Sequence, residues 1–237
     1  MPNDDSQYEC KKCKDTEFVF YKDLNGYEYA KECECRTLKI ANRLLEKSGI
    51  SEEFQSKTFA NFEERGIPQI TEAKNKAREY YMSFSQKEEN KDKNNSIMFM
   101  GQVGSGKTHL ATALANNLIK QKNVAVVYMG YRQTATRLKQ LITNEYEYTT
   151  ELNKFKDARV LFIDDMLKGK ITEADVNLLY EIVDYRYYNK KPMIITTEKT
   201  RKELIEFDEA LASRIIEMSK NNIVELQGKE LNYRLYD

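Results

Sequence analysis

Gly101-Gln102-Val103-Gly104-Ser105-Gly106-Lys107-Thr108 is the stretch that decides the fold of this 237-residue chain. It has the pattern G-x4-G-K-T, whose glycines let the backbone curl around a phosphate group and point its N–H groups inward. An apolar run at 97–100 precedes it, and apolar residues at helical spacing follow it over 109–122. This order of strand, loop and helix predicts a nucleotide-binding loop, with Lys107 on the β- and γ-phosphates and Thr108 on Mg²⁺.

Two acidic residues end another apolar run, 160–163. A site for Mg²⁺ and a nucleotide needs an acid on a neighbouring strand. We therefore expect Asp164 to hold Mg²⁺ through water and Asp165 to polarise the attacking water. Together with the loop at 101–108, this pair predicts a P-loop ATPase that uses ATP and Mg²⁺.

Short apolar runs alternate with helical patterns through most of the remaining sequence. The expected strands are 97–100, 124–128, 160–163, 193–196 and 223–226, and the expected helices are 109–122, 134–142, 173–188 and 209–218. Strands that alternate with helices favour parallel pairing. We predict an α/β fold with a parallel sheet flanked by helices.

Three further residue positions bear on the nucleotide. Thr197 and Glu198 end an expected strand, where a polar side chain could read the γ-phosphate. Arg214 could stabilise transition-state charge in a neighbouring subunit, or could be an ordinary surface salt-bridge residue. His109, the single histidine, directly follows Thr108, and we expect it to pack beside the nucleotide site without binding a metal.

Composition and charge limit the classes of function. Lys and Arg total 38, as do Asp and Glu, so the net charge of zero gives no global sign of a nucleic-acid or membrane partner. The start of the chain lacks a basic stretch followed by an apolar run, and no window approaches the roughly 20 apolar residues that span a bilayer. We expect a soluble cytoplasmic protein with no membrane contact.

All four cysteines lie near the start of the chain, as Cys10-x2-Cys13 and Cys33-x-Cys35. A reducing compartment disfavours disulfides, and paired cysteines of this kind suit a tetrahedral zinc site. An iron–sulfur cluster or free thiols remain alternatives. Acids outnumber bases in this module, which favours a protein partner over a phosphate backbone.

The order of patterns divides the chain into three parts. Residues 1–36 form the zinc-binding module, in which 18–21 and 27–29 are expected to make a hairpin through a tight turn at Asn25-Gly26. Residues 37–70 form a helix and a linker, and 71–237 form the ATPase domain, which begins with a helix and a solvated loop at 86–95.

With these residues in view, the chain resembles the AAA+ helicase loaders of bacteria and phages, the DnaC/DnaI type, especially phage-like members with a cysteine-rich N-terminus. The cysteine module, the phosphate loop and the acidic pair carry part of the resemblance. The rest lies in these segments: Lys57–Phe62, Thr196–Glu198, Ser213-Arg214 and 228–234. It implies an AAA+ ATPase domain that binds ATP and single-stranded DNA, and an N-terminal module that binds the hexameric replicative helicase.

The resemblance also implies roles for individual residues. Arg214 would be a finger that acts on a neighbouring subunit, and Arg234 would be a second nucleotide sensor. Many relatives have Ser-Asn where this chain has Thr197-Glu198. A carboxylate there would repel the γ-phosphate unless it pairs with a base or points away, so Thr197 is an equal candidate for the sensor.

Only 11 residues follow Leu226, too few for the usual AAA+ helical lid. We therefore expect a lid-less core whose nucleotide site is completed by a neighbouring subunit, a homo-oligomer when nucleotide is bound, and weak ATPase activity alone. Segment 128–139 interleaves aromatic and basic residues, as single-stranded DNA binding requires, although a solvated helix face is an equal explanation.

Two other functions fit parts of the sequence. A transposase-helper ATPase of the IstB type has a similar core, but such proteins usually lack the cysteine module and act on duplex DNA. A nucleotide-gated adaptor that barely hydrolyses ATP is favoured by Glu198 and the missing lid, and disfavoured by Asp165 and Arg214.

Overall fold

A five-stranded parallel sheet forms the centre of the protein, of which the computed structural model describes residues 8–85 and 94–236. The spatial order of the strands is β4-β5-β6-β3-β7. Their bounds are β3 Ile97–Gly101, β4 Val126–Gly130, β5 Val160–Met166, β6 Met193–Thr197 and β7 Ile223–Leu226. The parallel α/β fold predicted from the sequence is confirmed. Most of the expected solvated loop 86–95 lies outside the described residues.

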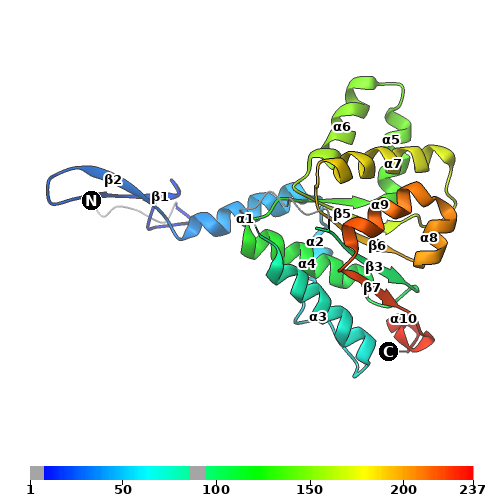
Figure 1. The fold of residues 1–237 in the computed structure, drawn as a ribbon. Helices are drawn as coiled ribbons and strands as arrows, with labels where there is room; N and C mark the ends of the chain where they lie inside the picture. The colour runs from blue at the N-terminus through cyan, green and yellow to red at the C-terminus, as the bar shows by residue number, and fades with distance from the viewer. Residues whose placement is uncertain (1–7, 86–93, 237) are drawn as a thin grey trace.

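Helices cover both faces of the sheet (Figure 1). On one face lie α3, Pro68–Ser83, and α4, Lys107–Lys122. The other face is covered by α5 Tyr131–Leu141, α6 Glu145–Asp157, α7 Glu173–Tyr188, α8 Arg201–Phe207 and α9 Glu209–Ser219. Successive residues of β3 point alternately into the two cores, Phe99 into the first and Met98 into the second, which explains why the whole strand is apolar.

The strand order corrects one expectation about the nucleotide site. β5, which carries Asp164, is not the neighbour of β3, because β6 lies between them. The carboxyl ends of parallel strands still meet at one edge of the sheet. The acid therefore reaches the phosphate loop across β6, and residues at the end of β6 lie between the two.

The helices α6 and α8 are absent from the sequence expectations. Only Leu152 and Phe155 of α6 are buried, so its apolar pattern is short. Both helices begin at side-chain caps that the sequence displays: Asn144 caps α6, and Thr200 with Glu203 forms a capping box on α8. These capping residues are the features of the sequence from which both helices could have been predicted.

A cysteine-bearing hairpin lies away from the sheet at the far end of α1, Cys35–Ser48 (Figure 1). Strands β1, Phe18–Lys22, and β2, Glu28–Glu32, pair antiparallel as expected. The chain turns tightly through Asn25 and Gly26 as expected: the Gly26 N–H donates to the Asp23 carbonyl at 3.1 Å. The Asp23 side chain supports the turn by accepting from the N–H groups of Asn25 and Tyr27.

The other end of α1 packs on the main core through Leu44 and Leu45. The short elements α2, Glu52–Gln55, η2, Lys229–Leu231, and α10, Tyr233–Tyr236, lie beside the phosphate loop side of the sheet. None of the helices in the described ranges could cross a membrane, since they are too short or too polar.

Candidate nucleotide site and metal centre

The loop 101–106 connects β3 to α4 in the form that the sequence pattern predicts. Gly101 has a φ of 119°, and a Cβ there would lie 2.1 Å from the Leu226 carbonyl oxygen. Gly106 has a φ of 83°, and a Cβ there would meet the ring of Phe62 at 2.7 Å. Only glycine fits at these two positions. The loop leads into the N-terminus of α4, where backbone N–H groups attract anions, so it suits a phosphate chain.

Lys107 lies inside this loop with 5% of its surface exposed. Its Nζ donates to the carbonyl oxygen of Gln102 at 2.5 Å. Burial lowers the pKa of Lys107 to about 8, while nearby Glu198 and Asp165 act in the opposite direction. A phosphate would supply the negative charge that this buried ammonium otherwise gets only from more distant groups.

Asp164 is the centre of a hydrogen-bond network at the end of β5. Its Oδ1 accepts from Thr108 Oγ1 at 2.9 Å and from Thr196 Oγ1 at 2.6 Å, and its Oδ2 accepts from Tyr128 Oη at 3.2 Å. Burial raises the pKa of Asp164, and these donors partly offset that effect. The network brings the two proposed Mg²⁺ residues, Thr108 and Asp164, together. Sequence analysis did not assign Tyr128 or Thr196 to this site.

Lys168 pairs with two further acids of the cleft, at the ends of β5 and β6. Its Nζ lies 3.0 Å from Asp165 Oδ2 and 2.7 Å from Glu198 Oε1. A carboxylate at position 198 would repel the γ-phosphate unless it paired with a base, and Lys168 is that base. Thr197, by contrast, is fully buried, donates to the Met166 carbonyl at 2.9 Å and does not line the cleft.

His109 holds the linker against α4. Its Nε2 lies 3.1 Å from both the Thr58 carbonyl oxygen and Asn61 Oδ1, and its ring contacts the edge of Phe62. Both partners offer acceptor oxygens, so Nε2 is the donor, and desolvation lowers the pKa of His109. The packing role expected from the sequence agrees with these contacts. Asn116 fixes the preceding stretch by donating to the carbonyls of Phe54, Gln55 and Lys57.

The C-terminal segment closes the other side of the phosphate loop. Tyr233 donates its N–H to the Gly104 carbonyl at 3.0 Å, and its ring faces Phe62 and the guanidinium of Arg65. Gln102 exchanges hydrogen bonds with the backbone of Gly228. A cleft of about 520 Å³ results, which falls within the usual size of a nucleotide or cofactor site. Linker, loop, acids and tail all contribute to its lining: Glu53, Phe54, Lys57, Asn61, Phe62, Glu63, Val103, Gly104, Ser105, Gly106, Lys107, Thr108, His109, Asp164, Asp165, Lys168, Glu198, Tyr233 and Arg234.

Arg214 lies outside that cleft. Its Nε is 2.8 Å from Asp184 Oδ1 on α7, its NH1 donates to the Ala210 carbonyl, and its guanidinium lies against the rings of Tyr180 and Tyr187. Within one chain, Arg214 therefore forms a surface ion pair and contacts no residue of its own phosphate loop.

The proposed DNA segment 128–139 does not present its aromatic residues for stacking. Tyr131 is 3% exposed, and the Tyr128 hydroxyl bonds to Asp164. Lys139 pairs with Asp175 at 2.8 Å, and Arg137 pairs with Glu151 at 3.6 Å. The aromatic-stacking interpretation of this segment is wrong, and the alternative of a solvated helix face fits α5.

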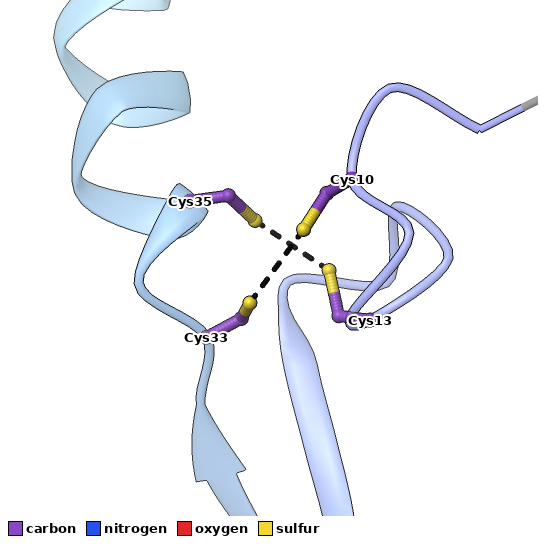
Figure 2. Close-up of side chains that lie close together, drawn as sticks. All are labelled: Cys10, Cys13, Cys33 and Cys35. Atoms are coloured by element: carbon purple, nitrogen blue, oxygen red, sulfur yellow. Dashed lines mark hydrogen bonds between the residues drawn. The ribbon is translucent and has the colours of Figure 1, made fainter.

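The four cysteine sulfurs converge between two loops and the start of α1 (Figure 2). All four Sγ atoms lie within 4.8 Å of one another, with Cys10 to Cys33 at 3.8 Å and Cys13 to Cys35 at 3.5 Å. A tetrahedral zinc ion with bonds of about 2.3 Å separates its sulfur ligands by about 3.8 Å. The donor set and its spacing fit zinc, and the backbone N–H of Cys13 helps to lower the pKa of the Cys10 thiol to about 7.

A protein-family comparison decides the family. The model described as "IstB-like ATP binding protein" matches residues 10–236, nearly the whole described chain. The chain belongs to the IstB-like ATP-binding family. It is 39% identical to the phage-like element PBSX protein XkdC of Bacillus subtilis, over 98% of this chain and 88% of that protein. It is also 41% identical to the uncharacterised Bacillus subtilis protein YqaM, over 88% of this chain and 68% of that protein.

Solved structures show the fold of this IstB-like protein. The crystal structure of DnaI matches with a TM-score of 0.61 at 18% identity, covering 76% of this chain and 93% of DnaI. The DnaC helicase loader matches with a TM-score of 0.58 at 21% identity, covering 75% of this chain and all of that structure. The resemblance to DnaC/DnaI loaders is confirmed at the level of an AAA+ P-loop fold.

Proposed function

We propose that this protein is an ATP-dependent loader of a hexameric replicative helicase, with weak ATPase activity on its own. The observation that carries the proposal is the combination of a loader-like AAA+ fold with a sulfur tetrahedron on a separate hairpin. The module from 1 to 36 would hold zinc and grip the helicase, and the linker 37–70 would join it to the ATPase domain 71–237. A relative encoded in a phage-like element is consistent with the phage-like loaders that the sequence resembles.

The residues of the cleft support a division of labour for ATP hydrolysis. Lys107 and the N–H groups of the loop 101–106 would hold the phosphates, and Thr108 and Asp164 would hold Mg²⁺. When bound, Mg²⁺ neutralises charge that develops on the transferred phosphoryl group. Asp165, beside Lys168 at the cleft, is the candidate to orient water.

A neighbouring subunit would complete the site. Arg214 lies away from its own cleft, so any action on the nucleotide must occur in trans, which requires a nucleotide-bound homo-oligomer. Arg234 lies in the lining of its own cleft and is the candidate second sensor. Single-stranded DNA is a proposed ligand of the ATPase domain, without the Tyr128 and Tyr131 rings as stacking surfaces.

Association with a helicase tests the proposal. Affinity-tagged full-length protein should retain a hexameric replicative helicase, with that of Bacillus subtilis as the probe, and should carry one zinc per chain. The chain lacking 1–36 should lose the helicase and keep ATP binding. A Lys107→Ala control should show the opposite pattern, with ATP binding lost and the helicase retained. Equal helicase recovery with and without 1–36 would contradict the assigned module role.

A transposase-helper ATPase is the second candidate, because the family model itself is IstB-like. The cysteine module is the feature that favours the loader. The same preparations distinguish the two functions: a helper should bind duplex DNA in the presence of ATP and ignore the helicase, whereas a loader should bind the helicase and prefer a single-stranded oligonucleotide.

A further inference from the structure

Lys168 is the residue of the cleft that the proposed function leaves without a task. It follows β5 and lies at the cleft between Asp165 and Glu198, with side-chain exposures of 39%, 39% and 30%. An ordinary surface lysine rotates freely and pairs weakly. Lys168 instead has its ammonium fixed by two carboxylates that come from the ends of two different strands.

The backbone before Lys168 turns it toward the cleft. Asp165 and Leu167 have φ values of 54° and 60°, the left-handed conformation that non-glycine residues rarely adopt. The pairing of β5 with β6 shifts register between Ile163 and Met166 at this point. Leu167 is held in the core with 4% exposure, so packing maintains the unusual turn. Strained backbone that surrounding structure maintains is typical of functional sites.

Donor counting shows what the ammonium can still bind. A lysine has three N–H donors, and among the described residues two carboxylate oxygens, at 3.0 Å and 2.7 Å, accept from Lys168. The side chain is partly exposed at the cleft, so its remaining donor is accessible from that side. The two carboxylates hold the ammonium in place and leave one direction open.

The charges that line the cleft indicate which kind of ligand this remaining N–H donor could bind. The lining near the loop has three carboxylates, Asp164, Asp165 and Glu198, against two lysines, Lys107 and Lys168. Without Lys168, Asp165 and Glu198 would lose the ammonium that pairs with both of them, and both carboxylates would then repel the terminal phosphate. Glu198 and Lys168 therefore act together: the carboxylate would repel a phosphate by itself, but it positions a lysine that attracts one.

We propose that Lys168 recognises the γ-phosphate and so distinguishes ATP from ADP, with Glu198 as its positioning residue. The inference rests on the proposed nucleotide site but not on helicase loading. It assigns the sensing of the γ-phosphate to a pair of residues, an acid directly after β6 and a base after β5, in place of one polar side chain. Thr197 has no part in it, because its hydroxyl is bonded to the Met166 carbonyl.

Binding measurements with two nucleotides test the proposal. Full-length protein with Mg²⁺ is titrated with ADP and with the non-hydrolysable ATP analogue AMPPCP at constant ionic strength. In Lys168→Met, AMPPCP affinity should fall about tenfold or more, the scale of one charge-assisted hydrogen bond, and ADP affinity should change by less than about threefold. Lys170→Met removes an exposed lysine two residues away and should leave both affinities unchanged.

Other results would overturn the inference. Equal losses for ADP and AMPPCP would place Lys168 on the other phosphates, and unchanged AMPPCP affinity would leave it a surface residue. If Lys168→Met melts at a lower temperature than the wild type, Lys168→Gln keeps a polar side chain and answers the same question. Wild-type protein that binds neither nucleotide would overturn the proposed site itself, a result distinct from failure of the Lys168 assignment.

Discussion

Thr196→Val tests whether the hydroxyl at the end of β6 organises both acids of the nucleotide site. Thr196 Oγ1 donates to Asp164 Oδ1 at 2.6 Å and accepts from the N–H of Asp165 at 2.8 Å. The side chain is completely buried. Valine keeps the shape of threonine and removes only these two bonds, so the substitution isolates their effect.

The expected loss of stability is estimated from the two hydrogen bonds that the substitution removes. A hydrogen bond to a charged group contributes about 1.5–3 kcal/mol, and a buried N–H without its acceptor costs about 1–3 kcal/mol. Asp164 keeps Thr108 and Tyr128 as donors, which limits the total. We expect the free energy of unfolding to fall by about 2–4 kcal/mol. The Mg²⁺ concentration that supports half-maximal nucleotide binding should rise about tenfold, because an oriented acid is a better ligand.

Thr112→Val is the matched control. Thr112 is also a completely buried threonine, on α4, but within the described residues its hydroxyl has no hydrogen-bond partner. Its removal should change the free energy of unfolding by less than about 1 kcal/mol and should leave the Mg²⁺ requirement unchanged. Urea unfolding and nucleotide titration at several Mg²⁺ concentrations measure both quantities. Equal unfolding midpoints and equal Mg²⁺ requirements for the two variants would refute the network.

Three other perturbations probe separate parts of the chain. Because the pKa of Lys107 is about 8 before nucleotide binds, binding above that pH must take up a proton, and ATP affinity should fall about tenfold per pH unit there. Calorimetry in buffers of different ionisation enthalpy should detect that proton, and its absence would contradict the buried ammonium. Cys33→Ser should lose the zinc measured by metal analysis and lose the helicase, but retain ATP affinity; retention of a full zinc equivalent would contradict the four-sulfur site. Arg186→Met removes a fully buried guanidinium that donates to the carbonyls of Phe155, Lys156, Ala158 and Pro192. It should lower the free energy of unfolding by about 3–5 kcal/mol. As a control, Arg132→Met at an exposed position of α5 should have little effect on the urea midpoint.

The parts of the fold that the sequence predicted are those decided by local pattern. The phosphate loop needs glycine where the backbone has positive φ, so Gly101 and Gly106 made the loop predictable from the sequence. β7 and α7 match their expected ranges because their apolar residues recur with one clear period. The four cysteines meet as expected, since each close pair flanks the hairpin, one before β1 and one between β2 and the first turn of α1.

The parts that the sequence did not reveal depend on contacts between distant segments. Tyr128 belongs to the acid network only because β4 pairs with β5, and strand order cannot be read from local pattern. Lys168 reaches Glu198 because of two left-handed residues that no motif encodes. Helix α8 is a different case, because the capping box of Thr200 and Glu203 marks its start in the sequence itself.

One continuous stretch of chain joins the cysteine cluster to the nucleotide cleft. Cys35 is both a member of the cluster and the first residue of α1, a helix of 14 residues that extends about 21 Å. After α1, Asn116 holds the carbonyl of Phe54, whose ring packs edge-on against Tyr128, and Tyr128 bonds to Asp164. These contacts give the hairpin a continuous physical connection to a wall of the cleft. By linkage, any effect of nucleotide on the affinity for a partner bound at the hairpin must equal the effect of that partner on nucleotide affinity.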